Sequence, residues 1–548
     1  MVPDKEFNLL HEPWILVIKP DGVTEEISLL NLFEKAHSYR GLAGELPTQD
    51  IAVLRLLLAI LHAVFARFDL NGEFEPISSP AEALARWKAL WDRREFPVPL
   101  LHKYLLEFED RFWLFHPERP FYQVANIGKA TEYTAAKLDG ALAESGNKLR
   151  LFPQRCGDSK KALCFGEAAR WLLYINAYDD TASKPSVRGL PSPGAGWLGK
   201  LGLITAVGSN LYETLLLNLV LLKDGSDELW GKETPLWEED EIRTDERVEI
   251  SMPDNPSGLL SLQSRRLLLK RQNASVTGYL LQGGDFFSKE NAFFEQMTMW
   301  RNAAKKKDDP PVYHPKRHDP GRQLWRDLAA LVGQGGSGRR PGVVSWLARL
   351  KSEGMIPSRH FQFQTAAVKY GDKDFFVDDV FGDAISFNAD LLTGFGESWI
   401  SRVLDEVAIA DKLAEQAGQL AQNLAIAAGA DNGWPLKMHA KEQAYYRMDL
   451  PFRRWLESID PQDVSVGKEE LCNLWWEQAK SIVRELGREL VNQTGPQAFA
   501  GRIITDEKKK KSYRYTAPEA YNRFLYKTSS REALQASNMN EGRVTHGE

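Results

Sequence analysis

The sequence predicts an α+β protein in which a large mixed N-terminal domain is followed by a C-terminal four-helix bundle. Its 548 residues exceed what one hydrophobic core usually organises, so at least two domains are expected. Strand, turn and helix patterns alternate up to about Asp390, whereas helix-period patterning dominates afterwards. We therefore expect residues 1–390 to form the mixed domain and residues 391–548 to form the bundle.

The N-terminal domain is expected to begin with a strand pair that packs on a buried helix. Residues 14–18 are a β-branched and aromatic run, which a Pro-Asp-Gly turn separates from a second strand at residues 23–29. Pro47 and Asp50 mark the first turn of a strongly apolar helix. The body of this helix is predicted at residues 51–68. Further helices are predicted at residues 81–91 and 166–177, and strands at 274–281 and 361–369.

Four amphipathic patterns make up the C-terminal part. They lie near residues 397–428, 434–458, 467–493 and 518–536. In the first of them, Val403, Val407, Leu413 and Leu420 recur at helical spacing and would bury one stripe. Because the connections are short, an antiparallel bundle is favoured.

The composition is that of an ordinary globular protein, with 43% hydrophobic and 26% charged residues. No uninterrupted apolar run approaches the roughly 20 residues of a membrane helix, and the polar start MVPDKEF does not resemble a signal peptide. The three cysteines show no Cys-x-x-Cys spacing, which argues against a cysteine-built zinc site. We expect a cytoplasmic protein with no membrane partner.

The net charge of −6 at pH 7 is unfavourable for a protein that binds nucleic acid by itself. A subunit that borrows most of its affinity from partners could tolerate this charge. Local basic clusters nevertheless occur, and each alone is typical of a solvated surface. They lie at residues 160–161, 265–266, 270–271, 305–307, 316–317, 339–340 and 508–511.

No catalytic signature is visible, and we predict no catalytic residue, metal or cofactor. The glycine-rich loop around Gly335 lacks the Lys and Ser or Thr of a phosphate-binding loop. His314 and His318 stand four residues apart, but the neighbouring Pro315 and Pro320 disfavour a helix that would align them. Two alternatives remain open: a metal- or nucleotide-dependent nucleic-acid-processing enzyme that uses these residues, and a purely structural helical scaffold.

Three sequence blocks carry a family resemblance: FNLLHEPWI at residues 7–15, HPERPFYQ at 116–123 and GSNLYETLLLNL at 208–219. With them the chain resembles the large subunit (CasA type) of the type I-E CRISPR Cascade surveillance complex, loosely over almost its whole length. The resemblance implies a non-catalytic subunit that reads the protospacer-adjacent motif through the minor groove, helps separate the strands and form the R-loop, and helps recruit a helicase-nuclease in antiviral defence. The implied partners are the other Cascade subunits, the CRISPR guide RNA, double-stranded target DNA and that helicase-nuclease. The family also ends in a four-helix bundle.

Two minor-groove elements follow from the resemblance. A glycine-rich loop at residues 184–197 carries Gly189, Gly194 and Gly196, and glycine lets a backbone approach a ligand closely. The second element is a lysine finger, for which Lys289 is the candidate. The minor groove offers a degenerate pattern of donors and acceptors, so such a reader should tolerate several motif sequences. An ordinary connection and a solubilising lysine are the structural alternatives.

The third implied element is a wedge that enters the duplex beside the motif. Its candidates are Tyr370, Gly371, Asp372 and Lys373, which form a Gly-Asp hairpin tip. The glutamine that relatives carry at this tip is missing, and Asp374 adds a second carboxylate that would repel phosphates. Either Lys373 or Tyr370 separates the strands, or the correspondence is shifted; an ordinary hairpin tip is the alternative.

A further loop at residues 151–161 matches the family element that reaches toward the 5′ handle of the guide RNA. Phe152, Pro153 and Gln154 are its candidate contacts, because an exposed aromatic ring can stack on an unpaired base. A Phe152 buried at a strand end is the alternative.

Basic residues of the bundle are expected to hold a DNA strand. The candidates are Arg453 and Arg454, together with the lysine run at residues 508–511.

Overall fold

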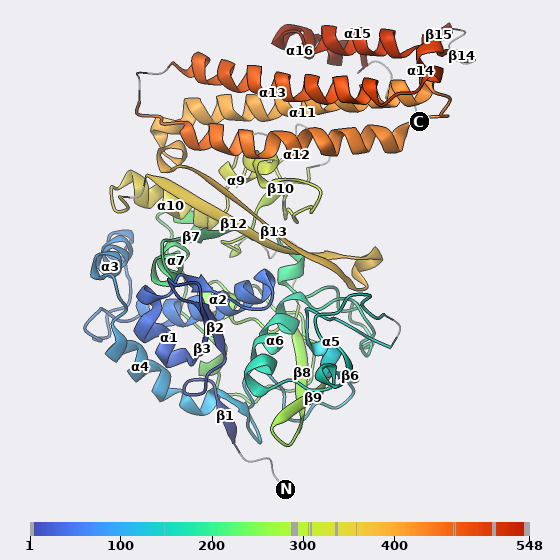
Figure 1. The fold of residues 1–548 in the computed structure, drawn as a ribbon. Helices are drawn as coiled ribbons and strands as arrows, with labels where there is room; N and C mark the ends of the chain where they lie inside the picture. Colours follow the sequence, from blue (N-terminus) through green and yellow to red (C-terminus); the bar gives the residue numbers. More distant parts are fainter. Residues whose placement is uncertain are drawn as a thin grey trace. The chain divides into compact units, whose positions relative to one another are not determined.

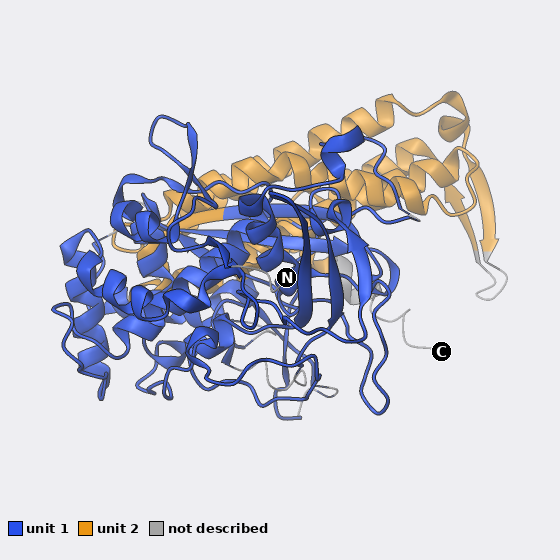
Figure 2. Cartoon of the chain, turned by 90° about the horizontal axis from the view of Figure 1, so that it is seen from below, with its two compact units in different colours: residues 1–322, 329–357, 361–384 blue, residues 323–328, 358–360, 385–548 orange. Residues whose placement is uncertain are grey.

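The computed structural model describes residues 5–146, 148–286, 294–304, 306, 309–334, 338–357, 359–463, 465, 467–506 and 511–541. The chain divides into two compact units, which are coloured separately in Figure 2. Unit 1 comprises residues 1–322, 329–357 and 361–384, and unit 2 comprises residues 323–328, 358–360 and 385–548. The last change of unit thus follows Ala384, close to the boundary expected at Asp390, but two short upstream segments also belong to unit 2.

Unit 1 contains both helices and strands, and its elements are labelled in Figure 1. Its helices are α1 (Leu29–Lys35), α2 (Pro47–Phe65), α3 (Pro80–Arg93), α4 (Val98–Glu107), α5 (Ala135–Leu138), α6 (Phe165–Tyr178), α7 (Leu211–Leu217), α8 (Pro256–Leu260), α9 (Leu328–Val332) and α10 (Gly342–Ser352). Its strands are β1 (Glu6–Asn8), β2 (Ile15–Ile18), β3 (Thr24–Ile27), β4 (Gly41–Leu42), β5 (Trp113–Phe115), β6 (Thr131–Thr134), β7 (Thr205–Val207), β8 (Arg265–Gln272), β9 (Ser275–Gly283), β10 (Trp300–Asn302), β11 (Tyr313–Pro315), β12 (His360–Tyr370) and β13 (Val377–Asn388). Three of these elements have an end in unit 2: Leu328 of α9, His360 of β12 and residues 385–388 of β13.

The strands of unit 1 form several small sheets. The three-stranded sheets have the orders β3-β2-β4, β6-β9-β8 and β13-β12-β7, and β1-β5 and β10-β11 form two-stranded ones. In the β12–β7 pair, Gln362 lies opposite Val207 and Gln364 opposite Thr205, in antiparallel register. Small sheets of this kind cannot bury a face alone, so they depend on the helices around them. The predicted α+β class with a helical C-terminal part is confirmed.

Helix α2 forms the centre of unit 1. It starts with Pro47 at its first position and Asp50 in its first turn, as predicted. Almost every side chain of the helix is buried, and α2 packs against α6 and α8. Its length and composition would allow it to cross a membrane, contrary to our expectation that no segment comes close to this. Its burial is that of a core helix, which is apolar all round because protein surrounds it.

A buried ion pair ties α2 to a distant part of the chain. The Arg55 Nη1 and Nη2 atoms donate to the two carboxylate oxygens of Glu295 at 2.9 and 3.0 Å. The Arg55 and Glu295 side chains are only 3% and 1% exposed. Such a pair offsets its desolvation cost only while both partners and their geometry are intact.

Unit 2 is a helical bundle. Its helices are α11 (Glu397–Ala427), α12 (Trp434–Ser458), α13 (Lys468–Asn492), α14 (Pro496–Ala500), α15 (Ala517–Lys527) and α16 (Arg531–Glu541), and β14 (Arg502–Asp506) pairs with β15 (Lys511–Tyr515). Helix α11 contacts α12, α13 and α15 (Figure 1). The predicted apolar stripe is buried: Val403, Val407, Leu413 and Leu420 are at most 7% exposed.

The fourth predicted helix of the bundle is interrupted. Helix α15 ends at Lys527, and α16 begins at Arg531. The Thr528 side chain lies at the break, where its hydroxyl donates to the Phe524 carbonyl at 2.9 Å. A Thr-Ser-Ser sequence follows Lys527, and such residues satisfy backbone groups outside a helix. A continuous helix over 518–536 was therefore a wrong prediction.

The upstream segment 323–328 belongs to unit 2, and one large side chain in it packs there. The Trp325 ring stacks on Phe452 with 4.4 Å between centroids, and its indole Nε1 donates to the Asp449 carboxylate at 2.9 Å. Trp325 is fully buried. The patterning along the sequence contained no sign of this docking.

We predict that Glu295→Ala lowers the free energy of unfolding of unit 1 by about 3 to 5 kcal/mol, because it leaves the Arg55 guanidinium buried without a counter-ion. Urea titration followed by circular dichroism would measure the loss. The matched control is Asp92→Ala, which breaks the exposed pair with Lys88 and should cost less than about 1 kcal/mol. Equal effects of the two variants would contradict the assigned role of the buried pair.

Candidate nucleic-acid interface

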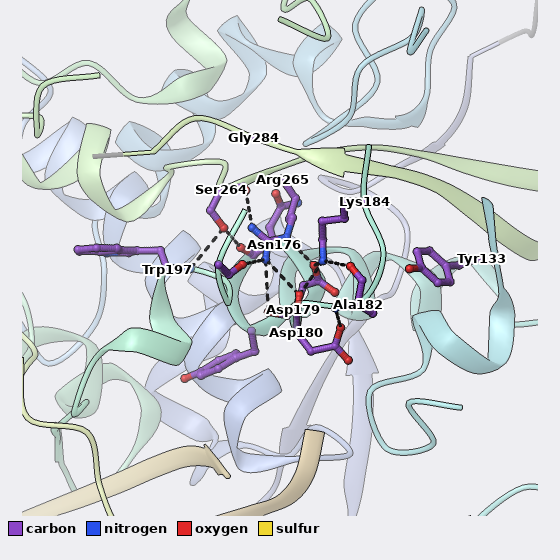
Figure 3. A network of polar contacts seen from close by, with 12 residues as sticks. Tyr133, Asn176, Asp179, Asp180, Ala182, Lys184, Trp197, Ser264, Arg265 and Gly284 are labelled. Carbon is purple, nitrogen blue, oxygen red and sulfur yellow. Dashed lines mark hydrogen bonds and ion pairs between the residues drawn. The ribbon is translucent and has the colours of Figure 1, made fainter. Parts of the chain in front are cut away.

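A buried ionic network lies where α6 ends (Figure 3). The Asp179 Oδ2 atom is 2.7 Å from Lys184 Nζ and 2.5 Å from Arg265 Nε. All three side chains are at most 3% exposed. The next residue, Asp180, forms a second buried pair with Lys137 at 2.5 Å. Four segments of unit 1 therefore meet at two adjacent carboxylates.

The network keeps Asp179 ionised. Burial alone would raise the pKa of its carboxyl, but the nearby Lys184 and Arg265 charges more than offset this, so the pKa is lowered from its ordinary value of 3.8. Burial lowers the pKa of Lys184, and the Asp179 charge opposes that effect. Because the folded-state pKa of Asp179 is depressed, its contribution to stability is present above about pH 4 and is lost as the pH falls below this value.

The same network fixes the glycine-rich loop. Arg265 Nη2 donates to the Gly194 carbonyl at 2.6 Å, and the Gly196 backbone N–H donates to the Asp179 carbonyl at 2.8 Å. At the other end of the loop, Lys184 Nζ donates to the Asp180 carbonyl at 2.6 Å. Both ends of the loop are thus tied to the end of α6.

The three glycines of the loop differ in what surrounds them. Gly196 is buried against the Ala177 carbonyl, where no Cβ would fit, so it serves packing. Gly189 is exposed, has a left-handed φ of +86° and has open space around it. Gly194 has only the Lys200 side chain nearby, whose Nζ would lie 3.5 Å from a Cβ. Gly189 and Gly194 therefore have faces that a ligand could approach.

The predicted wedge tip is joined to the same region. The Thr181 backbone N–H donates to the Asp374 carbonyl at 2.9 Å, and the Thr181 hydroxyl donates to the Lys373 carbonyl at 3.0 Å. Asp372 and Lys373 are exposed. Arg317 donates to both carboxylate oxygens of Asp374 at 3.0 Å, so the repulsion expected from this carboxylate is compensated.

The structure corrects the role expected of Tyr370. Its hydroxyl donates to the Tyr178 carbonyl at 2.7 Å, and its ring lies against Gly199. Tyr370 therefore supports the base of the tip and does not project from it. Gly371 lies against the Phe376 ring in the same turn.

Phe375 is the tip residue that our sequence interpretation missed. Its side chain is 56% exposed, beside the exposed Lys373. The signal was the Asp-Phe-Phe sequence directly after the turn, in which two successive rings cannot both face one side of a hairpin.

The loop that contains Phe152 is exposed, which excludes the alternative of a Phe152 buried at a strand end. The Phe152 side chain is 95% exposed, Gln154 is exposed and Pro153 is partly exposed. The buried Glu144 carboxylate fixes the ends of the loop, because it accepts from the Arg150 backbone N–H at 2.9 Å and from Lys160 Nζ at 2.8 Å.

The remaining candidates for DNA contact are the predicted lysines and arginines, and they differ in whether their side chains are described and unpaired. Lys289 lies outside the described residues, and so do residues 508–510 of the lysine run. In unit 2, Arg453 Nε donates to Asp449 at 2.8 Å, so this guanidinium is already engaged, whereas Arg454 is exposed.

Two residues of the alternative enzymatic interpretation, His314 and His318, lie in the described part of the chain. His314 lies in β11, opposite Arg301 of β10, and His318 Nε2 is 2.8 Å from the Leu203 carbonyl. Gly335 is outside the described residues. Within the described part of the chain, no group of three or more His, Cys, Asp or Glu side chains could hold a metal ion.

We predict that Asp179→Ala lowers the free energy of unfolding of unit 1 by about 3 to 5 kcal/mol and loosens the glycine-rich loop, because Lys184 and Arg265 lose their shared counter-ion. Trypsin should then cleave after Lys184 and Arg188 faster than in the unsubstituted protein. Asp158→Ala, which removes an exposed carboxylate, is the control and should change neither property. Unaltered cleavage in Asp179→Ala would show that the network does not hold the loop.

Comparisons with known proteins assign this chain to a family. The family model of the CRISPR-associated protein Cse1 matches residues 8–486. A curated relative, the CRISPR-associated protein CasA/Cse1 of Thermus thermophilus, is 34% identical over 241 residues, which are 44% of this chain and 43% of the relative. The match therefore spans less than half the length of that curated relative.

Solved structures are similar over nearly the whole chain. The crystal structure of Thermobifida fusca Cse1 has a TM-score of 0.80 and 31% identity, and the match covers 97% of this chain and 98% of that one. Cse1 from Acidimicrobium ferrooxidans has a TM-score of 0.75 at 26% identity, with 97% and 99% covered. A chain of a CRISPR RNA-guided surveillance complex shares the fold, with a TM-score of 0.70 at 16% identity over 96% of this chain and 99% of that one. The chain belongs to the family of the CRISPR-associated protein Cse1.

Proposed function

We propose that this chain is the non-catalytic DNA-recognition subunit of an RNA-guided CRISPR surveillance complex that acts in the cytoplasm. The observation that carries the proposal is the junction at the end of α6, where the buried Asp179 network holds the glycine-rich loop and the adjoining Thr181 holds the hairpin tip. Two exposed elements on one rigid support suit a protein that must dock on a duplex and distort it at a fixed distance. Family membership and the fold shared with a surveillance-complex chain support the same conclusion.

Recognition of the flanking motif would use the minor groove. The backbone at Gly189 can approach the groove closely because the space around it is open, and at Gly194 only the Lys200 side chain lies nearby. Lys289 would supply a donor to the acceptors that A·T pairs present, and such contacts discriminate only loosely among sequences. The guide RNA would read the rest of the target by base pairing.

Strand separation would follow from the hairpin tip. Phe375 offers an exposed ring that can stack on an unpaired base, and Lys373 beside it can neutralise a phosphate. Base pairing between guide and target nearly offsets the cost of opening the duplex, so the protein has to position DNA and need not catalyse a reaction. A partner helicase-nuclease would then cleave the DNA.

The remaining contacts would hold the complex together. Phe152, Pro153 and Gln154 would bind the other Cascade subunits near the guide RNA, and Arg454 would help the bundle hold a DNA strand. The engaged Arg453 is a weaker candidate for this role.

We predict that the reconstituted complex binds targets that carry the flanking motif more tightly than targets that lack it, and that Lys289→Ala reduces this difference because a minor-groove donor is removed. A gel shift on targets that differ only in the flanking motif measures both effects. Lys88→Ala, at a lysine on α3 far along the chain, is the control. Equal binding to the two targets by the unsubstituted complex would refute the proposed function, whereas an unaltered preference in Lys289→Ala would remove only Lys289.

We predict that Phe375→Ala slows opening of the first base pairs beside the motif by about tenfold, because stacking of a base on an aromatic ring is worth about 1 to 3 kcal/mol. Fluorescence of 2-aminopurine placed in those pairs would follow the opening. Phe74→Ala is the matched control, since Phe74 is also an exposed phenylalanine of unit 1, at 69%. If the two variants open the duplex at the same rate, the tip does not act through Phe375.

A further inference from the structure

Lys200 occupies a position between the two elements that are proposed to touch DNA. It is the last residue of the short 3₁₀ helix Leu198–Lys200, which follows the glycine-rich loop. Its Nζ lies near the open face of Gly194, 3.5 Å from where a Cβ would be. The preceding Gly199 lies against the Tyr370 ring at the base of the hairpin tip. The Lys200 side chain therefore lies beside the loop, the residue before it packs against the base of the hairpin, and the side chain stays partly exposed.

The carboxylates of the neighbouring loop and hairpin already have other partners. Asp179 is paired with Lys184 and Arg265, and Asp374 is paired through both oxygens with Arg317. The Lys200 ammonium makes no hydrogen bond or ion pair with any residue that the structure describes, although the Lys200 backbone N–H donates to the Trp197 carbonyl at 3.1 Å.

Arg247 is a second cation near Lys200, and its guanidinium is hydrogen-bonded to backbone carbonyls of the protein. Arg247 Nε donates to the Gly284 carbonyl at 3.0 Å, and its Nη1 donates to the Pro191 carbonyl. Arg247 thereby connects the glycine-rich loop to the start of the segment that leads to Lys289. Its side chain is buried, and its positive charge acts on Lys200.

The unpaired ammonium is unfavourable in the free protein. Burial, together with the charges of Arg265, Arg317 and Arg247, lowers the pKa of Lys200 to about 8, and the Asp374 charge opposes this only in part. The group is still mostly protonated at pH 7. An anion beside it would relieve the repulsion from the three guanidinium groups, so the site favours a negatively charged ligand.

We propose that Lys200 binds a phosphodiester of the DNA backbone, between the loop that approaches the minor groove and the tip that separates the strands. The inference rests on the proposed function, and it assigns this lysine a contact that holds the duplex in register without reading sequence. Gly194 contributes by leaving the ammonium uncovered, and the paired arginines contribute by repelling other cations from the site.

The test uses the complete reconstituted complex with Lys200→Met, which removes the charge and keeps the length of the side chain. Loss of one phosphate contact should weaken binding about fivefold at physiological salt and reduce the slope of log affinity against log salt by about 0.9. The effect should be equal on targets with and without the flanking motif, since a phosphate carries no sequence information. Lys88→Met is the matched control and should leave the slope unaltered.

Two further measurements distinguish a lost phosphate contact from a loss of stability and from a failure of the proposed function. The thermal unfolding midpoint of Lys200→Met should equal or exceed that of the unsubstituted protein, because a desolvated ammonium has been removed. If the midpoint falls instead, Lys200→Gln serves as the second variant. An unaltered salt slope, or weaker binding with no change of slope, overturns the phosphate assignment. Failure of the unsubstituted complex to prefer motif-bearing DNA refutes the proposed function independently of Lys200.

Discussion

The carboxylate of Asp179 is the interaction on which the candidate interface depends. It is buried and ionised, and two cations from different segments share it. A buried charge of this kind is costly unless all its partners are present, so the arrangement is either complete or strongly destabilising. This requirement makes the end of α6 a rigid point. The glycine-rich loop and the hairpin tip are attached to this region by hydrogen bonds from Arg265, from Thr181 and from the backbone.

The pairing of charges around Asp179 bears on the proposed DNA binding of an acidic protein. The net charge is −6, yet the carboxylates in and beside the Asp179 network all form ion pairs. Their partners are Lys137, Lys184, Arg265 and Arg317. The groups that remain available are the backbone at Gly189 and Gly194, the exposed ring of Phe375, and Lys200, whose ammonium has no counter-ion among the described residues. Under the proposed function, a surface of this composition would position a nucleic acid and would not hold it by bulk charge. Such a protein suits an assembly in which partners supply most of the affinity.

Local sequence signals predicted the elements but not their junctions. Pro47 and Asp50 correctly marked the start of α2, and the Gly-Asp turn correctly placed the hairpin between β12 and β13, because turn and cap chemistry acts over a few residues. The anchoring of Tyr370 beneath the tip depends on Tyr178, which is 192 residues away, so no local pattern could reveal it. The docking of Trp325 in unit 2 was missed for the same reason.

The sequence by itself determined the fold class, the family resemblance and the composition of each candidate loop, since these follow from hydrophobic period, turn residues and short motifs. Only the tertiary structure decided which candidates have free faces. It distinguished Gly196, which serves packing, from Gly189 and Gly194, which have open faces. It also showed that Phe375, and not Tyr370, is the exposed aromatic residue at the tip. The physical reason is that exposure and ion pairing are properties of segments brought together from distant parts of the chain. Lys184, Arg265 and Asp374 acquire their roles only when folding places them around the end of one helix.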